Sequence, residues 1–306
     1  MISVGVDLGG TKALAVRIDG SATVASTTVQ VDSSVSTLDA ICQSVASVFD
    51  DTVEVVGIGV AGLVDHSEGM LLWGPHTSGT RLDIRAQVTD TFGVATSVDN
   101  DANTAAYGEL KLGAATGYHN VLMVTLGTGI GGAIIVDESI YRGGGFAGEW
   151  GHVQIERDGL LCDCGKHGCW ETRASGPALA RLALQLIESN PNSSLLKYLD
   201  SSSATGETVV AAADAGDETA RALVTEVGRS FGEGLAGLAA ILDPELIVVG
   251  GGLGSVGEAI LGPARRVLAD SLPGAGFRIP PAVQVATLGR LAGAVGAALL
   301  AKDELL

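Results

Sequence analysis

The stretch that decides the fold is Asp7-Leu8-Gly9-Gly10-Thr11-Lys12, which lies between two segments of extended character. Residues 2–8 form a short apolar run typical of a buried strand, and residues 13–19 continue in the same extended pattern. The unit is therefore predicted to be strand, glycine turn, strand. A Walker loop and a dinucleotide-binding fingerprint both require a helix after the glycines, so the pattern excludes both of them.

The glycine turn has two interpretations. Gly9 and Gly10 leave backbone N–H groups free to approach anionic oxygens, and Thr11 and Lys12 add a hydroxyl and an ammonium group. That combination suits a nucleotide phosphate with its magnesium ion, and Asp7 is the acidic end of the strand before the turn. Gly-Gly is also an ordinary choice for a hairpin turn, so the motif alone does not separate the two.

Two further glycine runs favour the phosphate interpretation. Leu126-Gly127-Thr128-Gly129-Ile130-Gly131-Gly132 lies between expected strands at 121–125 and 133–136, and Gly250-Gly251-Gly252 follows an expected strand at 246–249. Repetition of the strand–turn–strand unit indicates a duplicated architecture with nucleotide between its halves. The expected nucleotide contacts are Gly9, Gly10, Thr11, Lys12, Gly127, Thr128, Gly129, Gly250, Gly251 and Gly252.

The rest of the chain shows mixed α/β patterning. Further strands are expected at 23–31, 53–60, 94–98 and 283–286, and helices at 37–49, from 102, at 176–188, 218–242 and 291–301. Residues 63–85 show no clear periodicity. We expect a small α/β lobe at 1–118, with the C-terminal helix at 291–306 as a candidate completion, and a large α/β lobe at 119–290.

Composition narrows the class of protein. The chain has 306 residues, 46% of them apolar, which is enough for two modest cores. A formal charge of −17 without a compensating basic block disfavours nucleic-acid and anionic-membrane partners. The sequence runs from Met1 directly into a strand pattern and holds no apolar run of membrane-spanning length, so we expect a cytoplasmic protein with no membrane segment.

Asp99-Asn100-Asp101 follows an expected strand and begins an expected helix. Phosphoryl transfer to a hydroxyl needs a carboxylate that orients the alcohol and accepts its proton, and Asp101 is the candidate, with Asn100 holding a neighbouring hydroxyl. These residue types are also the preferred helix caps, which is the simpler interpretation of the motif alone. Because a helix N-terminus favours the ionised carboxylate, we expect Asp101 to be a weak base.

His152, Cys162, Cys164 and Cys169 supply one imidazole and three thiolates, the ligand set of a closed structural zinc site. The alternative to a zinc site is that the three clustered cysteines are reduced and unrelated in function. Cys42 is far from them in the sequence and is not a candidate ligand. Glu149 and Glu171 flank the cluster, and zinc would fix both near a common point where they could contact the hydroxyl groups of a substrate. Each could equally be a solvated surface glutamate.

Taken together, five motifs resemble the ROK family of sugar kinases and sugar-responsive repressors, from about residue 2 to residue 300. They are Asp-Leu-Gly-Gly-Thr-Lys, Asn-Asp-Ala-Asn, Leu-Gly-Thr-Gly-Ile-Gly-Gly, Gly-Glu-Trp-Gly-His and Cys-Asp-Cys-Gly-Lys-His-Gly-Cys-Trp-Glu. The resemblance implies a two-lobed, actin-like and hexokinase-like ATPase fold with sugar and ATP in an interlobe cleft. It also implies a homo-oligomer, either a dimer or a tetramer.

The resemblance implies an activity as well, namely transfer of a phosphoryl group from magnesium-bound ATP to the 6-hydroxyl of a hexose, with glucose favoured. It makes Asp101 the base and directs Asp7 toward the magnesium ion and the glycine runs toward ATP. It also places the remaining sugar contacts at Gly62, Asn100, Glu149, His152 and Glu171. N-acetylmannosamine, N-acetylglucosamine and fructose stay open as substrates, because His76 replaces the asparagine usual in glucose-phosphorylating relatives. Polyphosphate stays open as a donor.

A sugar-responsive transcription repressor is the alternative from another class, since that branch of the family retains the sugar and zinc motifs. Such repressors normally carry an N-terminal DNA-binding domain, whereas here the first phosphate strand begins at Ile2 and the charge is acidic. The kinase interpretation is therefore favoured.

Overall fold

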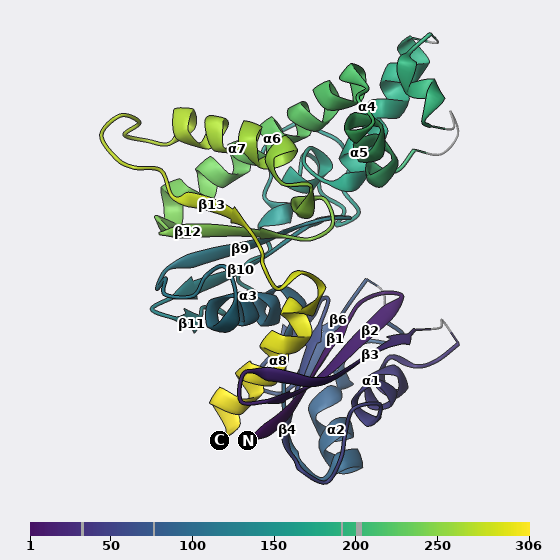
Figure 1. The fold of residues 1–306 in the computed structure, drawn as a ribbon, viewed down its shortest axis with the longest axis vertical. Coiled ribbons are helices and arrows are strands. Elements are labelled where there is room, and N and C mark those ends of the chain that lie inside the picture. The colour runs from purple at the N-terminus through teal and green to yellow at the C-terminus, as the bar shows by residue number, and fades with distance from the viewer. Residues whose placement is uncertain (32–33, 76, 191, 200–203) are drawn as a thin grey trace. The chain divides into compact units, whose positions relative to one another are not determined.

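The structure is a computed structural model that describes residues 1–31, 34–75, 77–190, 192–199 and 204–306 (Figure 1). His76 lies outside the described residues. The chain divides into two compact units. The first contains Met1–Met123, Ala133–Gly148 and Thr287–Leu306, and the second contains Val124–Gly132 and Glu149–Ala286. The predicted boundary near residue 118 stays a prediction.

The first unit is built around a five-stranded sheet and a smaller three-stranded sheet. Its elements are β1 (Ile2–Leu8), β2 (Lys12–Asp19), β3 (Ala22–Gln30), α1 (Thr37–Ala46), β4 (Val53–Val60), β5 (Leu63–Asp65), β6 (Met70–Trp73), β7 (Leu82–Asp83), α2 (Ile84–Phe92), β8 (Ala95–Asn100), α3 (Asp101–Leu112) and α8 (Ala292–Leu305). The large sheet has the order β3-β2-β1-β4-β8 and the small one β5-β6-β7.

The register of the large sheet brings three candidate segments to one edge. β1 and β2 are antiparallel, as the strand–turn–strand motif predicts, with Leu8 opposite Ala13. β1, β4 and β8 are parallel, so their carboxyl ends meet at the same edge, where Leu8 pairs with Val60 and Val60 pairs with Asn100. The glycine turn after Leu8 and the corner at Asn100 therefore leave the sheet side by side.

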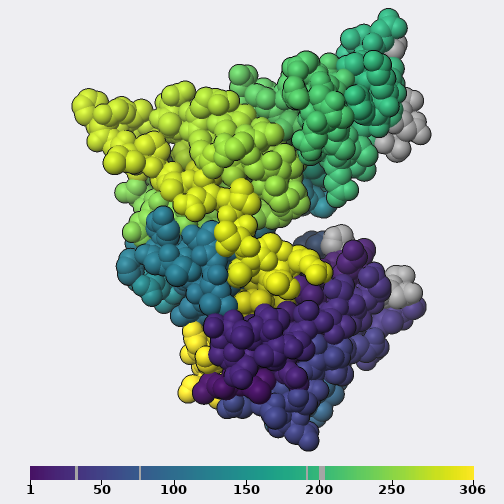
Figure 2. All heavy atoms as spheres, in the orientation of Figure 1, coloured from purple at the N-terminus to yellow at the C-terminus, as the bar shows by residue number. Residues whose placement is uncertain are grey.

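The two faces of this sheet are covered by different helices (Figure 1). Val4 and Val6 of β1 belong to an apolar core that also contains Ile41 and Val45 of α1. Gly5 lies between these valines, and side chains alternate across a strand, so it faces the opposite side. There the C-terminal helix α8 covers β1 and β4, and Figure 2 shows its residues in yellow against the purple N-terminal strands.

Glycines allow α8 to approach the sheet closely. A Cβ atom at Gly5 would lie 1.9 Å from the carbonyl oxygen of Ala294, and one at Gly57 would lie 1.9 Å from that of Ala297. The same helix meets α3 closely, because a Cβ atom at Gly296 would lie 1.7 Å from the carbonyl oxygen of Thr104. The first unit therefore depends on small residues wherever α8 touches it.

Gly5→Ala is expected to lower the free energy of unfolding by about 3 kcal/mol, because the added methyl group would displace the α8 backbone from β1. Thermal and urea unfolding followed by circular dichroism measure the change. Gly144→Ala is the matched control, since a Cβ atom there meets nothing within 4 Å, and its effect should stay within about 0.5 kcal/mol. Equal stability of the two variants would contradict the close packing.

The other five-stranded sheet has the order β11-β10-β9-β12-β13. Its strands β12 and β13, the end of β9 and the start of β10 belong to the second unit, whereas β11 and the rest of β9 and β10 belong to the first. The elements are β9 (Val121–Leu126), β10 (Ile130–Val136), β11 (Ser139–Ile140), α4 (Gly176–Ser189), α5 (Gly206–Asp214), α6 (Glu218–Leu242), β12 (Leu246–Gly250), α7 (Glu258–Ser271) and β13 (Ala282–Val285). β12 and β13 are parallel. No helix among the described residues is long and apolar enough to cross a bilayer.

The structure confirms most predicted elements and adds several. The strand at 53–60 and the helix at 218–242 have the predicted bounds. Residues 63–85, which showed no periodicity, instead form the three strands of the small sheet and the start of α2. The helices α5 and α7 were also missed; α7 carries Pro263 within it, which disguises its pattern.

Candidate active site

Asn100 shapes the corner between β8 and α3. Its side-chain oxygen accepts hydrogen bonds from the backbone N–H groups of Ala102 (2.8 Å) and Asn103 (3.4 Å), so Asn100 is the N-cap of α3. Its amide group donates to the carbonyl oxygen of Gly62 (3.2 Å). The helix-cap interpretation thus applies to Asn100, which leaves the carboxylate of Asp101 available for chemistry.

Asp101 is half-buried at the first position of α3. Burial raises the pKa of its carboxyl group, against the lowering effect of hydrogen bonds from the backbone N–H groups of Ala102 and of Asp101 itself and from the side chain of Asn100. The expectation that the helix N-terminus would keep Asp101 a weak base is therefore wrong, because desolvation outweighs the helix terminus. A raised pKa makes this carboxylate a better proton acceptor.

Asp7 shares the electrostatic environment of Asp101. Burial, and then repulsion from the Asp101 carboxylate, raise the pKa of Asp7 to about 7. Asp7 lies at the end of β1 directly before the first glycine turn, and α8 packs against it, because a Cβ atom at Gly293 would lie 2.5 Å from its Oδ2 atom. Two carboxylates that repel each other at one sheet edge are suited to receive a cation.

Gly62 holds a position that only glycine fits. Its φ angle is +131°, and a Cβ atom there would lie 2.2 Å from the carbonyl oxygen of Trp73 and 2.7 Å from the Cα atom of Gly74. Because its own carbonyl oxygen accepts the Asn100 amide, Gly62 links the small sheet to the Asn100–Asp101 corner. Its predicted contact with a sugar stays a prediction.

The first glycine turn is exposed and lines a cavity within the first unit. The N–H group of Gly9 donates to the carbonyl oxygen of Lys12 (2.9 Å), and residues 9–12 are all exposed. A cavity of about 520 Å³ lies beside them. It is lined by Leu8, Gly9, Gly10, Thr11, Val31, Val35, Thr37, Val60, Ala61, Thr77 and Ser78.

The second glycine turn lines a larger cavity within the second unit. Gly127 donates to the carbonyl oxygen of Gly129 (3.0 Å) and accepts from the N–H group of Gly176 at the start of α4 (2.8 Å). The cavity has a volume of about 1260 Å³, and Gly127, Thr128 and Gly252 all line it, together with α4 and α5. Two of the three predicted glycine runs therefore meet at one cavity large enough for a nucleotide.

The other glycines of these runs have packing roles. Gly251 has a φ angle of +84°, and a Cβ atom there would lie 2.4 Å from the carbonyl oxygen of Leu126. A Cβ atom at Gly132 would lie 2.0 Å from the ring of Trp150, whose indole N–H donates to the carbonyl oxygen of Gly131 (3.2 Å). The backbone of Gly131 and Gly132 thus packs against Trp150 and fixes its position, one residue after Glu149.

The predicted zinc ligands converge. The candidate ligand atoms of His152, Cys162, Cys164 and Cys169 all lie within 4.8 Å of one another. The Sγ atoms of Cys164 and Cys169 are 3.5 Å apart, and the Sγ atom of Cys162 is 3.6 Å from Nδ1 of His152. Tetrahedral zinc with Zn–S bonds of about 2.3 Å separates its sulfur ligands by about 3.8 Å, so the donor set fits one closed zinc site.

Glu171 connects the cysteine cluster to the second glycine turn. Its Oε1 atom lies 3.0 Å from Sγ of Cys162 and 3.3 Å from Nδ1 of His152. Its Oε2 atom accepts a hydrogen bond from the N–H group of Ile130 (3.4 Å). Glu149 is exposed, three residues before His152, at the start of the short helix Trp150–His152. The structure therefore brings Glu171 and His152 together with the three cysteines, whereas the joint action of the predicted sugar contacts on one sugar stays a prediction.

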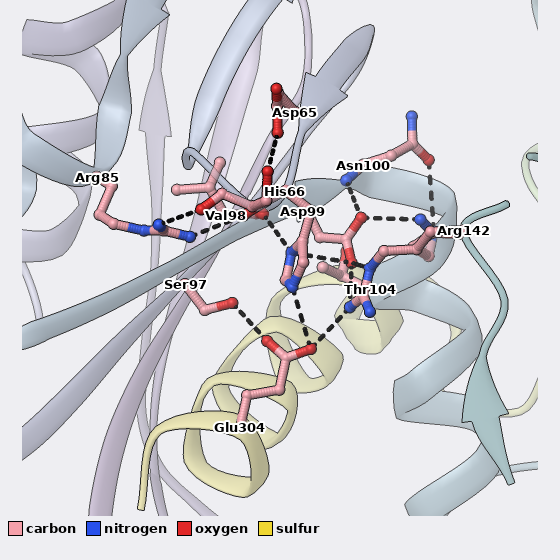
Figure 3. A network of polar contacts seen from close by, with 12 residues as sticks. Asp65, His66, Arg85, Ser97, Val98, Asp99, Asn100, Thr104, Arg142 and Glu304 are labelled. Atoms are coloured by element: carbon pink, nitrogen blue, oxygen red, sulfur yellow. Dashed lines mark hydrogen bonds and ion pairs between the residues drawn. The ribbon is translucent and has the colours of Figure 1, made fainter. Parts of the chain in front are cut away.

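A charged network behind the Asn100–Asp101 corner was not predicted. His66, Asp99, Arg142 and Glu304 all join it, as Figure 3 shows. Burial alone would raise the pKa of Glu304, but the hydrogen bond and charge of His66, with Ser97 and Arg142, lower it to about 2. The sequence carries no signal for this network, because its members lie as far apart as residues 66 and 304.

Comparison with known proteins identifies the family. A glucokinase of Streptomyces coelicolor is 38% identical to this chain over 99% of this chain and 98% of its own length. A crystal structure of a ROK family glucokinase from Streptomyces griseus in complex with glucose and AMPPNP is 39% identical, with a TM-score of 0.88 that covers 99% of this chain and 100% of the other.

A ROK hexokinase structure from Thermus thermophilus is 32% identical, with a TM-score of 0.81, and covers 100% of this chain and 99% of its own. These likenesses confirm the predicted two-lobed, actin-like α/β fold. The model of the ROK family matches residues 3–304, and the chain therefore belongs to the ROK family.

Proposed function

We propose that this protein is an ATP-dependent hexose kinase that phosphorylates the 6-hydroxyl group of glucose. The observation that carries the proposal is the half-buried Asp101 carboxylate at the start of α3, with its pKa raised and its helix capped by the neighbouring Asn100. The similarity to glucokinases of two Streptomyces species along nearly the whole chain supports glucose as the substrate.

In the proposed reaction, the carboxylate of Asp101 accepts the proton of the sugar 6-hydroxyl as the oxygen attacks the γ-phosphorus atom of ATP. The bond between the γ-phosphorus and the bridging oxygen breaks, and ADP leaves with the electron pair. Asn100 in the first unit and Glu149, His152 and Glu171 in the second are the proposed contacts that orient the sugar hydroxyls.

The proposed nucleotide site uses the cavity of about 1260 Å³ in the second unit for adenosine. The exposed turn at 9–12 and the half-buried turn at 127–129 offer backbone N–H groups to the phosphates. Asp7 is the proposed partner of magnesium, which supplies charge neutralisation of the phosphates when bound. Polyphosphate as donor would use the phosphate turns without the adenosine cavity, so a comparison of the two donors tests this assignment.

The four ligands His152, Cys162, Cys164 and Cys169 would hold a structural zinc ion, since they fill all four tetrahedral positions and leave none for water. Because Nδ1 of His152 faces the thiols, its Nε2 edge is left for a sugar hydroxyl. Zinc-binding cysteines must stay reduced, and this requirement together with ATP as substrate supports a cytoplasmic location. The proposed oligomer, a dimer or a tetramer, is measurable by analytical ultracentrifugation.

A coupled assay of ADP release with purified protein, ATP and magnesium tests the function. Glucose is expected to give the largest kcat/KM in a panel with N-acetylmannosamine, N-acetylglucosamine, fructose and mannose. A protein that releases no ADP with any of these sugars, while binding an operator-like DNA in a gel-shift assay, would instead be a sugar-responsive regulator. A higher kcat/KM with another hexose would reject glucose and keep the kinase.

A further inference from the structure

Asp99 is a buried carboxylate whose two oxygens serve different partners. It is only 3% exposed. Its Oδ1 atom accepts hydrogen bonds from the backbone N–H group of Asn100 (2.7 Å) and from the side chain of Asn103 (2.8 Å). Both bonds act on the first turn of α3, so the orientation of Asp99 sets the orientation of the corner that carries Asp101.

The other oxygen of Asp99 is held by Arg142. The guanidinium group of Arg142 approaches Oδ2 through Nε (2.8 Å) and Nη2 (2.7 Å), and Figure 3 shows the two side chains pointing toward each other. Two charge-assisted hydrogen bonds from one planar group fix both the distance and the plane of the carboxylate. Arg142 therefore determines where Asp99 points.

Arg142 is itself fixed from two sides. Its carbonyl oxygen accepts hydrogen bonds from the N–H groups of Gly145 (2.8 Å) and Ala147 (3.2 Å), so its backbone belongs to an ordered turn. Its Nη2 atom also contacts Oε1 of Glu304 near the end of α8 (2.8 Å). The second oxygen of Glu304 accepts from Ser97 (2.8 Å), on the strand that ends at Asn100.

His66 completes the charge balance. Its Nε2 atom lies 3.3 Å from Oε1 of Glu304, and its Nδ1 atom lies 2.9 Å from the carbonyl oxygen of Val98. Burial opposes its protonation, but Glu304 and Asp99 outweigh burial and raise the pKa of His66. Two carboxylates thus face one guanidinium and one imidazole, and removal of Arg142 would leave Asp99 buried without its principal cation.

We propose that Arg142 is a positioning residue for phosphoryl transfer, which acts through Asp99 to hold the Asn100–Asp101 corner in its productive orientation. The inference rests on the proposed kinase function. Loss of the guanidinium group lets the Asp99 carboxylate turn, and the backbone of Asn100 shifts with it. A displacement of about 1 Å at a catalytic group lowers the rate about 10²-fold.

A purely structural role for Arg142 would be to connect α8 to the rest of the first unit. The pair formed by Lys111 and Asp303 (3.1 Å) provides the matched control, because it also connects α8 to the rest of the first unit, in this case to α3, and uses the residue next to Glu304. Lys111 lies ten residues along α3 from Asp101, which is about 15 Å along the helix axis. Its removal should therefore affect stability without affecting the corner.

The experiment compares Arg142→Ala, Arg142→Lys, Asp99→Asn and Lys111→Ala by steady-state kinetics with glucose and ATP, at a temperature well below each melting midpoint. Arg142→Ala is expected to lower kcat about 10²-fold with little change in the KM for ATP. Arg142→Lys, which keeps the charge but not the planar fork, should be intermediate. Lys111→Ala should retain the kcat of the unaltered enzyme.

Addition of methylguanidinium provides a readout that a structural role would not move. It should restore part of the kcat of Arg142→Ala by occupying the site beside Asp99, and it should leave Lys111→Ala unchanged. Unaltered kcat in Arg142→Ala, or equal losses of kcat in the Arg142 and Lys111 variants, would overturn the inference. Failure of the proposed function is distinct from this, since it would show as absent turnover in the unaltered enzyme.

Discussion

Asp101→Asn is expected to lower kcat for glucose phosphorylation by about 10²–10⁴-fold, the usual contribution of a general base. The amide has nearly the shape of the carboxylate but does not accept the hydroxyl proton. Because Asn100 and not Asp101 caps α3, the helix should begin at the same residue. Stopped-time assays of ADP and sugar-phosphate formation measure the loss.

The matched control is Asp83→Asn. Asp83 is the N-cap of α2 in the same unit, and its carboxylate accepts a hydrogen bond from the N–H group of Ala86 (3.0 Å). Asparagine caps helices about as well as aspartate does, so this variant should keep both activity and stability. Affinity for a non-hydrolysable ATP analogue should be unchanged in Asp101→Asn, because the cavity beside α4 and α5 lies in the other unit. Turnover by Asp101→Asn at the rate of the unaltered enzyme would remove Asp101 from the mechanism.

Cys164→Ser is expected to reduce bound zinc from about one ion per chain to a small fraction, and to raise the KM for glucose about 10–100-fold. Cys164 is exposed, so its replacement disturbs little packing. The neighbouring Trp170 stays fixed by its stacking on Phe231 at a centroid distance of 5.5 Å and by its hydrogen bond to Ser230 (3.0 Å). The loss should therefore fall on the orientation of His152 and Glu171 and not on the fold of the unit.

Metal analysis by mass spectrometry and glucose titration measure these two effects, with Cys42→Ser as the control. Cys42 is a free thiol of α1 in the first unit, and its replacement should change neither zinc content nor KM. A Cys164→Ser protein that lacks zinc but keeps the KM of the unaltered enzyme would separate the metal from sugar binding. Zinc retained at one ion per chain would show that the other three residues suffice.

The local parts of the fold were predictable because each has a short-range cause. The hairpin around Gly9 and Gly10 follows from strand patterns on both sides of a turn, and the cysteine cluster follows from the spacing of its ligands. The small sheet at 63–83 was not predictable, because its strands are only two to four residues long and cannot show an alternation of apolar and polar residues. Pairing between these strands, not their composition, defines them.

The site was predictable where its functional residues are adjacent in the sequence, as Asn100 and Asp101 are. It was not predictable where position depends on distant partners. Arg142 meets Asp99 only because the chain returns after β11, and Glu304 joins them only because α8 packs against β8. The pKa of Asp101 was misjudged for the same reason, since desolvation depends on the whole unit and the helix start alone suggested the opposite sign.

The close seating of α8 on β1 and β4 has a consequence for synthesis on the ribosome. The first unit needs its last helix to bury one face of its sheet, yet residues 113–291 are translated between α3 and α8. At about 5–20 residues per second, that interval lasts on the order of 10–40 s. During this interval the glycine-lined face of the nascent sheet stays uncovered, so a chaperone could bind it there. The second unit also has time to fold first, although it comes second in the sequence.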